Sequence, residues 1–136
     1  MSKCIFCQIV AGELPSTKVH EDDYALAFLN VQAINPGHTL VIPKTHTEEF
    51  QDLPEQEYTG LMSVVQTVAK AQKKAYQPKR VGLMVQGFEV AHGHIHVVPL
   101  YEATDITSKK ILDETALNPS PDEMVAEAAK MQRAIG

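Results

Sequence analysis

The stretch from Pro54 to Ala75 carries the longest regular pattern in the chain, because apolar residues recur along it at intervals of three and four. Such spacing gathers apolar side chains on one face of an amphipathic helix. Pro54 suits the first turn of that helix, and lysines near its end complement the helix dipole. A helix with one apolar face has to pack against a second layer, so this segment predicts a layered domain. The apolar face consists of Tyr58, Leu61, Met62, Val65, Val68, Ala69 and Ala75.

Four short apolar segments flank this helix and have the composition of strands. Residues 24–29 and 39–42 precede the helix, and residues 81–85 and 95–100 follow it. Only a short connection around Gly87 separates the last two segments, which predicts an antiparallel hairpin. Strands on both sides of one long helix predict an α+β fold, with the helix packed on one face of the sheet.

The end of the chain carries one further helical segment, the alanine-rich residues 122–135. A chain of 136 residues is long enough for one substantial core and too short for two. We therefore expect a single domain over residues 1–136, with its core in about residues 1–103. Residues 104–136 would form a polar connection and the C-terminal helix.

Composition limits the classes of partner that the chain can bind. The formal net charge is −5. Binding of a nucleic acid requires a concentrated basic surface, which this overall charge does not favour. No segment approaches the roughly 20 apolar residues of a membrane span. The N-terminus also lacks the apolar run of a secretory signal. We therefore expect a cytoplasmic protein that binds neither nucleic acid nor membrane.

Both cysteines of the chain lie in one pair, Cys4-x-x-Cys7. In a reducing compartment such a pair is more typical of metal binding or redox chemistry than of a stabilising disulfide. Two thiolates do not complete a tetrahedral zinc site, so two further ligands would have to come from elsewhere in the chain. The spacing by itself leaves three alternatives open: a metal site, a redox pair, and two buried cysteines without a ligand role.

Three of the six histidines, His92, His94 and His96, alternate with other residues directly after Glu89-Val90-Ala91. Alternate residues of a strand face the same side, so this pattern predicts three imidazoles on one patch. Burying three imidazoles without partners would be costly, which favours a functional cluster. The histidines could hold a catalytic zinc with an open position for water. Alternatively, one histidine could be a nucleophile that the others orient, and the pattern alone leaves both open.

The sequence around these histidines resembles the histidine triad superfamily. The segments that carry the resemblance are residues 4–13, residues 27–30, the block Pro36-Gly37-His38-Thr39-Leu40-Val41-Ile42-Pro43-Lys44-Thr45-His46, and His92-Gly93-His94-Ile95-His96-Val97-Val98. They follow one another in the order expected of bacterial members and cover most of the chain. The resemblance implies the α+β fold of that family, an antiparallel sheet with one long packed helix and a C-terminal helix, paired into a homodimer.

The resemblance also implies an enzyme that forms a covalent bond between a histidine and a nucleotide. His94 would be the nucleophile that attacks the α-phosphate of a purine nucleoside phosphoramidate or a dinucleoside polyphosphate. His96 and His38 would contact the phosphate and help to manage the proton. Backbone amides near Glu89 and Val90 would take up the developing negative charge.

The resemblance further assigns the nucleotide-binding residues. The apolar slot for the base would be formed by Phe6, Ile9, Phe28 and Leu29. Asn30 would hold the ribose, at a position where family members commonly have Asp. Gly93 stands where the signature usually has a larger apolar residue, and it could admit a close neighbour. Glu89 stands where many members have Ser, and a protonated Glu89 could act as a general acid toward the leaving group.

In members that keep the cysteine pair, the resemblance implies a structural zinc. Its ligands here would be Cys4, Cys7, His46 and His92, so that the ion joins the N-terminus to the segment that carries the other site histidines. Two alternative functions remain at this stage. One is a zinc-stabilised nucleotide-binding or interaction module without turnover, and the other is a catalytic-zinc hydrolase.

Overall fold

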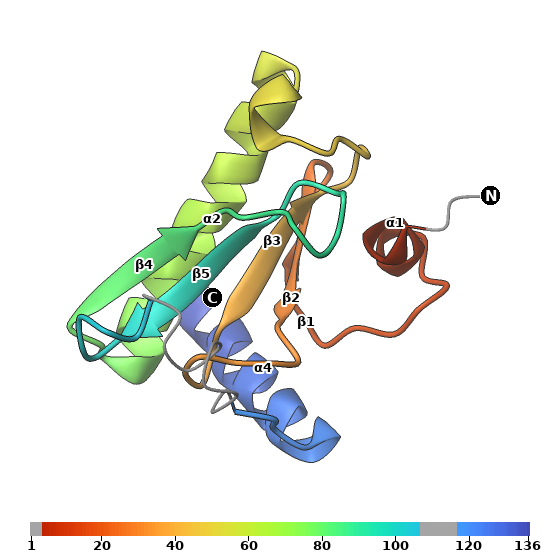
Figure 1. Ribbon diagram of the computed structural model, residues 1–136. Helices are drawn as coiled ribbons and strands as arrows, with labels where there is room; N and C mark the ends of the chain where they lie inside the picture. Colours follow the sequence, from red (N-terminus) through yellow and green to blue (C-terminus); the bar gives the residue numbers. More distant parts are fainter. Residues whose placement is uncertain (1–3, 107–116) are drawn as a thin grey trace.

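The computed structural model describes residues 4–106 and 117–136, and Figure 1 shows its strands and helices. The described strands form one sheet in the order β1-β2-β3-β5-β4, in which every neighbouring pair is antiparallel. The strands are β1 (Lys18–Glu21), β2 (Ala25–Leu29), β3 (Thr39–Pro43), β4 (Arg80–Met84) and β5 (Ile95–Leu100). The helices are α1 (Ile5–Val10), α2 (Glu55–Tyr76) and α4 (Pro121–Ile135), with a short 3-10 turn η1 (Phe50–Asp52). The predicted α+β fold is confirmed.

The long helix and the four predicted strands lie where their patterns place them. Helix α2 begins at Glu55 and ends at Tyr76, one residue later at each end than the predicted segment. It ends because Gln77 adopts a left-handed conformation (φ 51°), from which its N–H donates to the carbonyl of Lys73. Strands β4 and β5 are hydrogen-bonded antiparallel neighbours, which confirms the predicted hairpin.

One helix and one strand, α1 and β1, are absent from the sequence-based prediction, as is the short turn η1. Helix α1 has 6 residues, and only Phe6 and Ile9 among them are buried, so its pattern is too short to show a helical period. Strand β1 has 4 residues with only Val19 buried, and its pairing with β2 changes register between Lys18 and His20. Neither segment carries enough regular apolar sequence to be recognised alone.

Helices α2 and α4 pack together on one face of the sheet (Figure 1). The core beneath them is centred on Val41 and Val97 of the sheet and on Leu61 and Val68 of α2, all completely buried. Helix α4 begins with a capping box at Ser120 and buries its Met124, Ala128 and Met131 face, as the sequence of residues 122–135 predicts.

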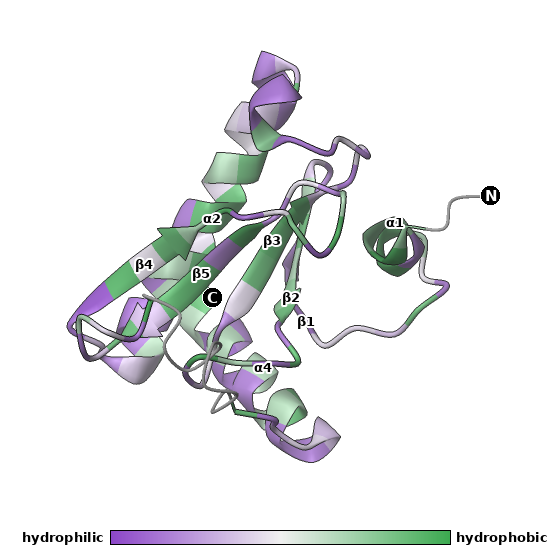
Figure 2. Cartoon of the chain, in the orientation of Figure 1, coloured by the Kyte–Doolittle hydropathy of each residue, from purple (hydrophilic) through white to green (hydrophobic). Residues whose placement is uncertain are grey.

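The opposite face of the sheet carries a second, smaller apolar cluster that α1 covers. Its buried members are Phe6, Ile9, Leu26, Phe28, Leu40 and Ile42. Every residue of β2 and β3 is buried, because one set of alternate side chains faces α2 and the other faces α1. Figure 2 accordingly shows hydrophobic residues along the inner strands and on α1. The burial of both faces explains why these strands appear in the sequence as continuous apolar runs.

Two expectations concern the whole chain. No helix within residues 4–106 and 117–136 is both long and apolar enough to cross a membrane. Of the predicted polar connection, residues 107–116 lie outside the part of the chain that the structure describes.

Candidate active site and metal centre

The histidines of the alternating motif do not all lie on a strand. Strand β5 begins at Ile95, so His92 and His94 belong to the connection that precedes it, and only His96 is a strand residue. The expectation of one strand presenting all three side chains is therefore wrong. The N–H of Gly93 donates to the carbonyl of Thr47 at 2.6 Å and not to a neighbouring strand, which explains why regular pairing starts later.

Gly93 allows the chain after His46 to approach this connection closely. A Cβ at position 93 would lie 3.2 Å from the carbonyl oxygen of Thr47 and 3.5 Å from the backbone nitrogen of Phe50. A larger side chain would therefore have to displace the backbone on the opposite side of the contact. The close neighbour expected from the unusual glycine is confirmed.

His38 and His96 form a hydrogen-bonded pair whose protons can be assigned from their partners. The backbone N–H of Ile34 donates to Nδ1 of His38 at 3.0 Å, so the proton of His38 must be on Nε2. This Nε2–H donates to Nδ1 of His96 at 2.9 Å, which leaves the proton of His96 on its own Nε2. The pair therefore presents one imidazole N–H, that of His96 Nε2, to whatever binds beside it.

His94 lies next to this pair with the opposite arrangement of its nitrogens. The ring centroids of His94 and His96 are 5.3 Å apart. Nδ1 of His94 donates to the backbone carbonyl of His92 at 2.7 Å, so its Nε2 carries a lone pair. The edge-to-face contact with Phe6 of α1, with centroids 5.1 Å apart, holds the ring from the side. His94 thus has the tautomer that a nucleophile requires.

Burial keeps the His38–His96 pair uncharged near neutral pH. Desolvation, with a smaller contribution from His96, lowers the pKa of His38 to about 3. Desolvation, with a smaller contribution from His94, lowers the pKa of His96 to about 4. Both imidazoles are therefore neutral at pH 7, and each has one donor nitrogen and one acceptor nitrogen, as their hydrogen bonds require.

These lowered pKa values predict that the protein loses stability in acid. An unfolded histidine takes up a proton near pH 6.5, whereas folded His38 and His96 do so only near pH 3 and 4. The contribution is constant above pH 6.5 and is lost as the pH falls toward these values, by at most about 1.4 kcal/mol per pH unit for each histidine. Urea unfolding at pH 7, 6 and 5 should show a steeper loss for wild type than for His38→Gln. Both proteins keep the Cys4 and Cys7 thiols, so metal release affects them equally, and parallel slopes would contradict the prediction.

The second cluster contains Cys4, Cys7, His46 and His92, whose ligand atoms all lie within 4.8 Å of one another. The Sγ atom of Cys7 is 3.2 Å from Nδ1 of His46 and 3.5 Å from Nδ1 of His92. The Sγ atom of Cys4 is also 3.5 Å from Nδ1 of His92. Sulfur and nitrogen ligands of a tetrahedral zinc with usual bond lengths lie about 3.6 Å apart. The four side chains therefore fit a metal ion.

A hydrogen bond to the carbonyl of Pro43 orients the imidazole of His92 as a metal ligand. Its Nε2–H donates to the carbonyl of Pro43 at 2.8 Å, so the lone pair of Nδ1 faces the two thiols. Burial lowers the pKa of His92, which favours the neutral imidazole that a metal needs. Cys4 is also the N-cap of α1, where its Sγ accepts from the N–H of Cys7 at 3.5 Å. Helix α1 thus brings both thiols to the connection before β5.

The structure separates the four residues predicted for the apolar base slot. Phe6, Ile9 and Phe28 lie together in the cluster beneath α1, and the rings of Phe6 and Phe28 meet edge to face at 5.7 Å. Leu29 faces the opposite side, in the core beneath α2 and α4. All four side chains are buried, so the residues predicted for the slot belong to the two apolar cores of the molecule.

The other predicted binding residues lie at the rim of the histidine cluster or outside it. Asn30 is half-buried, and its Nδ2 is 3.4 Å from Nε2 of His38. Val90 packs against the cluster beneath α1, whereas Glu89 is exposed in the connection between β4 and β5. The role of Glu89 as a proton donor to the leaving group therefore remains a prediction.

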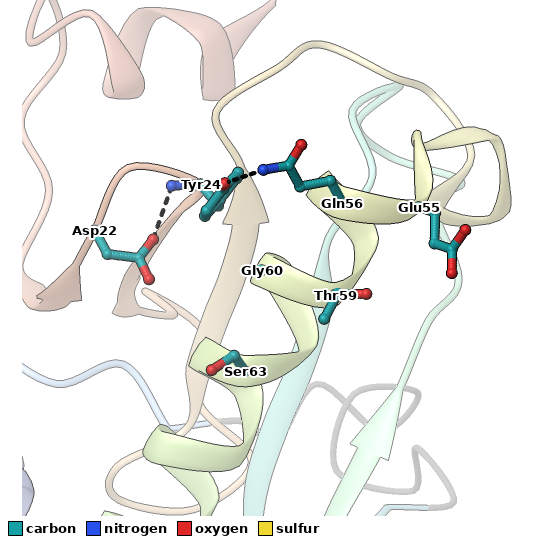
Figure 3. A pocket seen from close by; sticks show the side chains of 7 residues that line it. All are labelled: Asp22, Tyr24, Glu55, Gln56, Thr59, Gly60 and Ser63. Atoms are coloured by element: carbon teal, nitrogen blue, oxygen red, sulfur yellow. Dashed lines mark hydrogen bonds between the residues drawn. The ribbon is translucent and has the colours of Figure 1, made fainter.

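An open hollow in the described part of the molecule lies away from the histidines. Figure 3 shows it between the turn after β1 and the start of α2, with Tyr24 and Gln56 joined by a hydrogen bond of 2.8 Å. Its volume is about 700 Å³, and it is open to solvent. None of the predicted site residues lines this hollow. The candidate site is therefore located by the chemistry of its side chains and not by a cavity.

Comparisons with known proteins agree with this geometry. The sequence profile of the HIT domain matches residues 11–103. An uncharacterised HIT-like protein of Methanocaldococcus jannaschii is 41% identical over 103 residues, which cover 73% of this chain and 80% of that protein. The adenosine 5'-monophosphoramidase of Saccharomyces cerevisiae is 38% identical over 97 residues, which cover 71% of this chain and 61% of the yeast protein.

Two crystal structures extend the comparison to the fold. A HIT-like protein of Bartonella henselae superposes with a TM-score of 0.82 at 29% identity, covering 97% of this chain and 96% of the other. A zinc-bound histidine triad family protein of Mycobacterium smegmatis superposes with a TM-score of 0.77 at 29% identity, covering 98% of this chain and 93% of the other. Profile, relatives and fold agree, and this chain belongs to the HIT-domain family, the histidine triad proteins.

Proposed function

We propose that the protein is a nucleotide hydrolase or nucleotidyl transferase that acts on the α-phosphate of purine nucleoside phosphoramidates or dinucleoside polyphosphates. The observation that carries this proposal is the 2.7 Å hydrogen bond from His94 Nδ1 to the carbonyl of His92. It keeps the Nε2 lone pair of His94 available for attack on phosphorus. The relative from yeast, named as an adenosine 5'-monophosphoramidase, supports the same class of chemistry.

The first proposed step forms a covalent intermediate on His94. Its Nε2 attacks the α-phosphorus, and the bond from phosphorus to the leaving group breaks. The N–H of His96 Nε2 donates a hydrogen bond to a phosphate oxygen, while His38 holds His96 in the required tautomer. The departing amine, or the phosphate oxygen that leaves from a dinucleoside polyphosphate, takes the electron pair of the broken bond and a proton, for which protonated Glu89 is the proposed donor.

The second step releases the nucleotide. Water attacks the phosphorus of the adduct and passes a proton to the Glu89 carboxylate, and His94 leaves with the electron pair on Nε2. Backbone amides near Glu89 and Val90 are the proposed donors to the phosphate oxygens. Asn30 is the proposed ribose contact, which its position beside His38 supports. Phe6, Ile9, Phe28 and Leu29 remain the proposed base-binding residues, with Leu29 the least supported because it faces the other core.

We propose that the metal held by Cys4, Cys7, His46 and His92 is a structural zinc. Two thiolates and two imidazoles are typical ligands of structural zinc, and the zinc-bound relative from M. smegmatis has the same fold. Four protein ligands fill a tetrahedral site, whereas a catalytic zinc needs an open position for water or substrate. This difference disfavours the catalytic-zinc alternative. Thiolate ligands persist in a reducing compartment, which supports the proposed cytoplasmic location.

We also propose that the chain is a single HIT domain that pairs into a homodimer. Among the described residues, β4 pairs only with β5, and Leu83 and Val85 are exposed at this edge of the sheet. A strand edge with exposed apolar side chains is a surface that another chain can cover. Sedimentation equilibrium tests the pairing, and a single species with the mass of one chain would contradict it.

The proposed activity is tested with purified protein and two classes of substrate. AMP and GMP phosphoramidates are incubated beside dinucleoside polyphosphates, and release of the mononucleotide is followed. Each reaction is repeated after chelation, under conditions in which circular dichroism shows folded protein. Turnover that survives metal removal would exclude a catalytic zinc. Tight nucleotide binding without turnover of either class would instead favour the non-enzymatic binding module.

Replacement of Glu89 by Gln should slow substrates with poor leaving groups more than activated ones. Gln keeps the shape of a protonated Glu but has no proton to transfer. We expect the ratio of turnover for an alkyl phosphoramidate to that for a nitrophenyl nucleotide ester to fall by about tenfold or more. Glu55→Gln is the matched control, because Glu55 lines the hollow away from the histidines (Figure 3). An unchanged ratio in Glu89→Gln would mean that the leaving-group proton comes from elsewhere.

A further inference from the structure

Gln72 interrupts the apolar face of α2. It follows Leu61, Val65 and Val68 at helical spacing on the side of the helix that packs on the sheet, and its exposed fraction is 0%. A buried amide costs free energy unless its polar atoms are hydrogen-bonded. An apolar residue at this position would avoid that cost, so the hydrogen bonds of Gln72 indicate what the amide does there.

The side-chain amide of Gln72 joins β5 to the turn before β3 through their main chains. Its Nε2 donates to the carbonyl of Gly37 at 2.9 Å and to the carbonyl of Val97 at 2.8 Å. Both partners are acceptors, so the NH2 group and not the oxygen must face them. The amide oxygen is buried and accepts no hydrogen bond from the described residues. Among the described residues, the side-chain amide of Gln72 therefore acts only as a hydrogen-bond donor.

This bridge lies where the regular pairing between β3 and β5 ends. The two strands are in register from Val41 opposite Ile95 to Thr39 opposite Val97. Farther along β5 comes Pro99, which has no N–H with which to extend the ladder. Gln72 supplies donors from the helix at the end of the ladder, so it links β5 to the turn before β3, where the hydrogen bonds between the two strands stop.

Both acceptors of the bridge are direct chain neighbours of the His38–His96 pair. Gly37 precedes His38, and Val97 follows His96. The hydrogen bond from His38 Nε2 to His96 Nδ1, which is 2.9 Å long, joins the same two segments of the chain. A change in the spacing of the two main chains would therefore lengthen or break the bond between the imidazoles, and a broken bond would free His96 to change its tautomer and rotamer.

We infer that Gln72 is a positioning residue for the His38–His96 pair, because its amide sets the distance between β5, which carries His96, and the segment directly before β3, which carries His38. The inference rests on the proposed function, in which the His96 Nε2–H has to meet a phosphate oxygen. Gln72 itself touches no substrate. It acts through the main chain on the opposite face of the sheet from the histidine rings, since α2 and the pair lie on different sides of β3 and β5.

The test compares Gln72→Met with Val68→Ala. Met keeps the length of the side chain but removes both donors, whereas Val68→Ala removes buried apolar atoms one turn earlier on the same helix. We expect Gln72→Met to lower kcat for an AMP phosphoramidate by about tenfold and to change KM by less than about twofold. In protein labelled with nitrogen-15, the scalar coupling across the His38 Nε2–H···Nδ1 His96 hydrogen bond should weaken or vanish. Val68→Ala should lower the melting temperature while both kcat and the coupling remain near wild type.

Two results would overturn the inference: a Gln72→Met protein with wild-type kcat and coupling, or a Val68→Ala protein that loses both to the same extent. Should Gln72→Met fail to fold, Gln72→Asn replaces it, because a shorter amide keeps a donor but cannot span both carbonyls. An inactive wild-type protein would contradict the proposed function. The nitrogen coupling would still decide the role of Gln72 in that case, since it needs no turnover.

Discussion

Replacement of His94 by Ala is expected to abolish turnover, with a loss on the order of 10⁴-fold or more, while nucleotide binding persists. The size of the effect follows from the proposed mechanism, in which only the Nε2 lone pair of His94 forms a bond to phosphorus. The other imidazoles lack this capacity in the folded protein, because Nδ1 of His96 accepts from His38 and Nδ1 of His38 accepts from Ile34. Their Nε2 atoms therefore carry protons and no lone pair.

The matched comparison is His96→Gln, which keeps a hydrogen-bond donor beside the phosphate. We expect this variant to retain slow turnover, with a loss of about a hundredfold. Binding of AMP to each variant is followed by calorimetry. Rapid quenching of the wild-type reaction should trap a nucleotidyl adduct that is labile in acid and stable in base, and peptide mapping should locate it on His94. A His94→Ala protein with a near-normal rate would rule out the covalent mechanism.

Replacement of both Cys4 and Cys7 by Ser should remove the metal and lower the melting temperature by about 10 °C or more. Metal binding of this kind is coupled to folding, so losing it removes several kcal/mol of stability. For a chain of this length, each kcal/mol corresponds to about 3 to 4 °C. The loss should concentrate in α1, since its buried contacts with the sheet are limited to Phe6, Ile9 and their neighbours.

Ile5→Ser is the matched control for the metal site. Ile5 lies in the same helix and is 51% exposed, so this change perturbs α1 without removing a ligand. Elemental analysis of protein purified without chelator should find one zinc per chain in wild type and in Ile5→Ser, and none in the double Cys variant. Turnover of the double variant, measured well below its melting temperature, should fall far less than that of His94→Ala. Wild-type protein without zinc would contradict the proposed site.

The periodic parts of the fold can be predicted from the sequence alone. The spacing of Leu61, Val65 and Val68 indicates the face of α2, and the apolar runs indicate the strands, because each pattern repeats several times within its own segment. Helix α1 gives no such signal, since only Phe6 and Ile9 of its residues are buried. Its position depends on contacts with β2 and β3 and on a thiol pair whose partners lie far along the chain.

Gln72 shows a related limit of pattern reasoning. A pattern of apolar residues along α2 omits Gln72. Its helical spacing from Val68 nevertheless places Gln72 on the buried face of the helix. The signal that could have identified it is therefore a polar residue at an apolar position. The carbonyls that it joins belong to Gly37, in the turn before β3, and to Val97 of β5, and these two segments lie on either side of α2 in the sequence. No local pattern contains both.

The amino-acid sequence identifies the histidines and cysteines of the two clusters, whereas the fold sets the chemical state of each side chain. Residue types and order identify the histidines and cysteines, because chemical identity is a local property of the chain. The assignment of His92 to the metal cluster, and of His94 to the position beside the His38–His96 pair, depends on where β5 begins. The tautomer of each imidazole is set by main-chain partners such as the carbonyl of Pro43 and the N–H of Ile34. Those partners are brought into contact only by folding, which is why the alternating motif could reveal the cluster but not the division of roles within it.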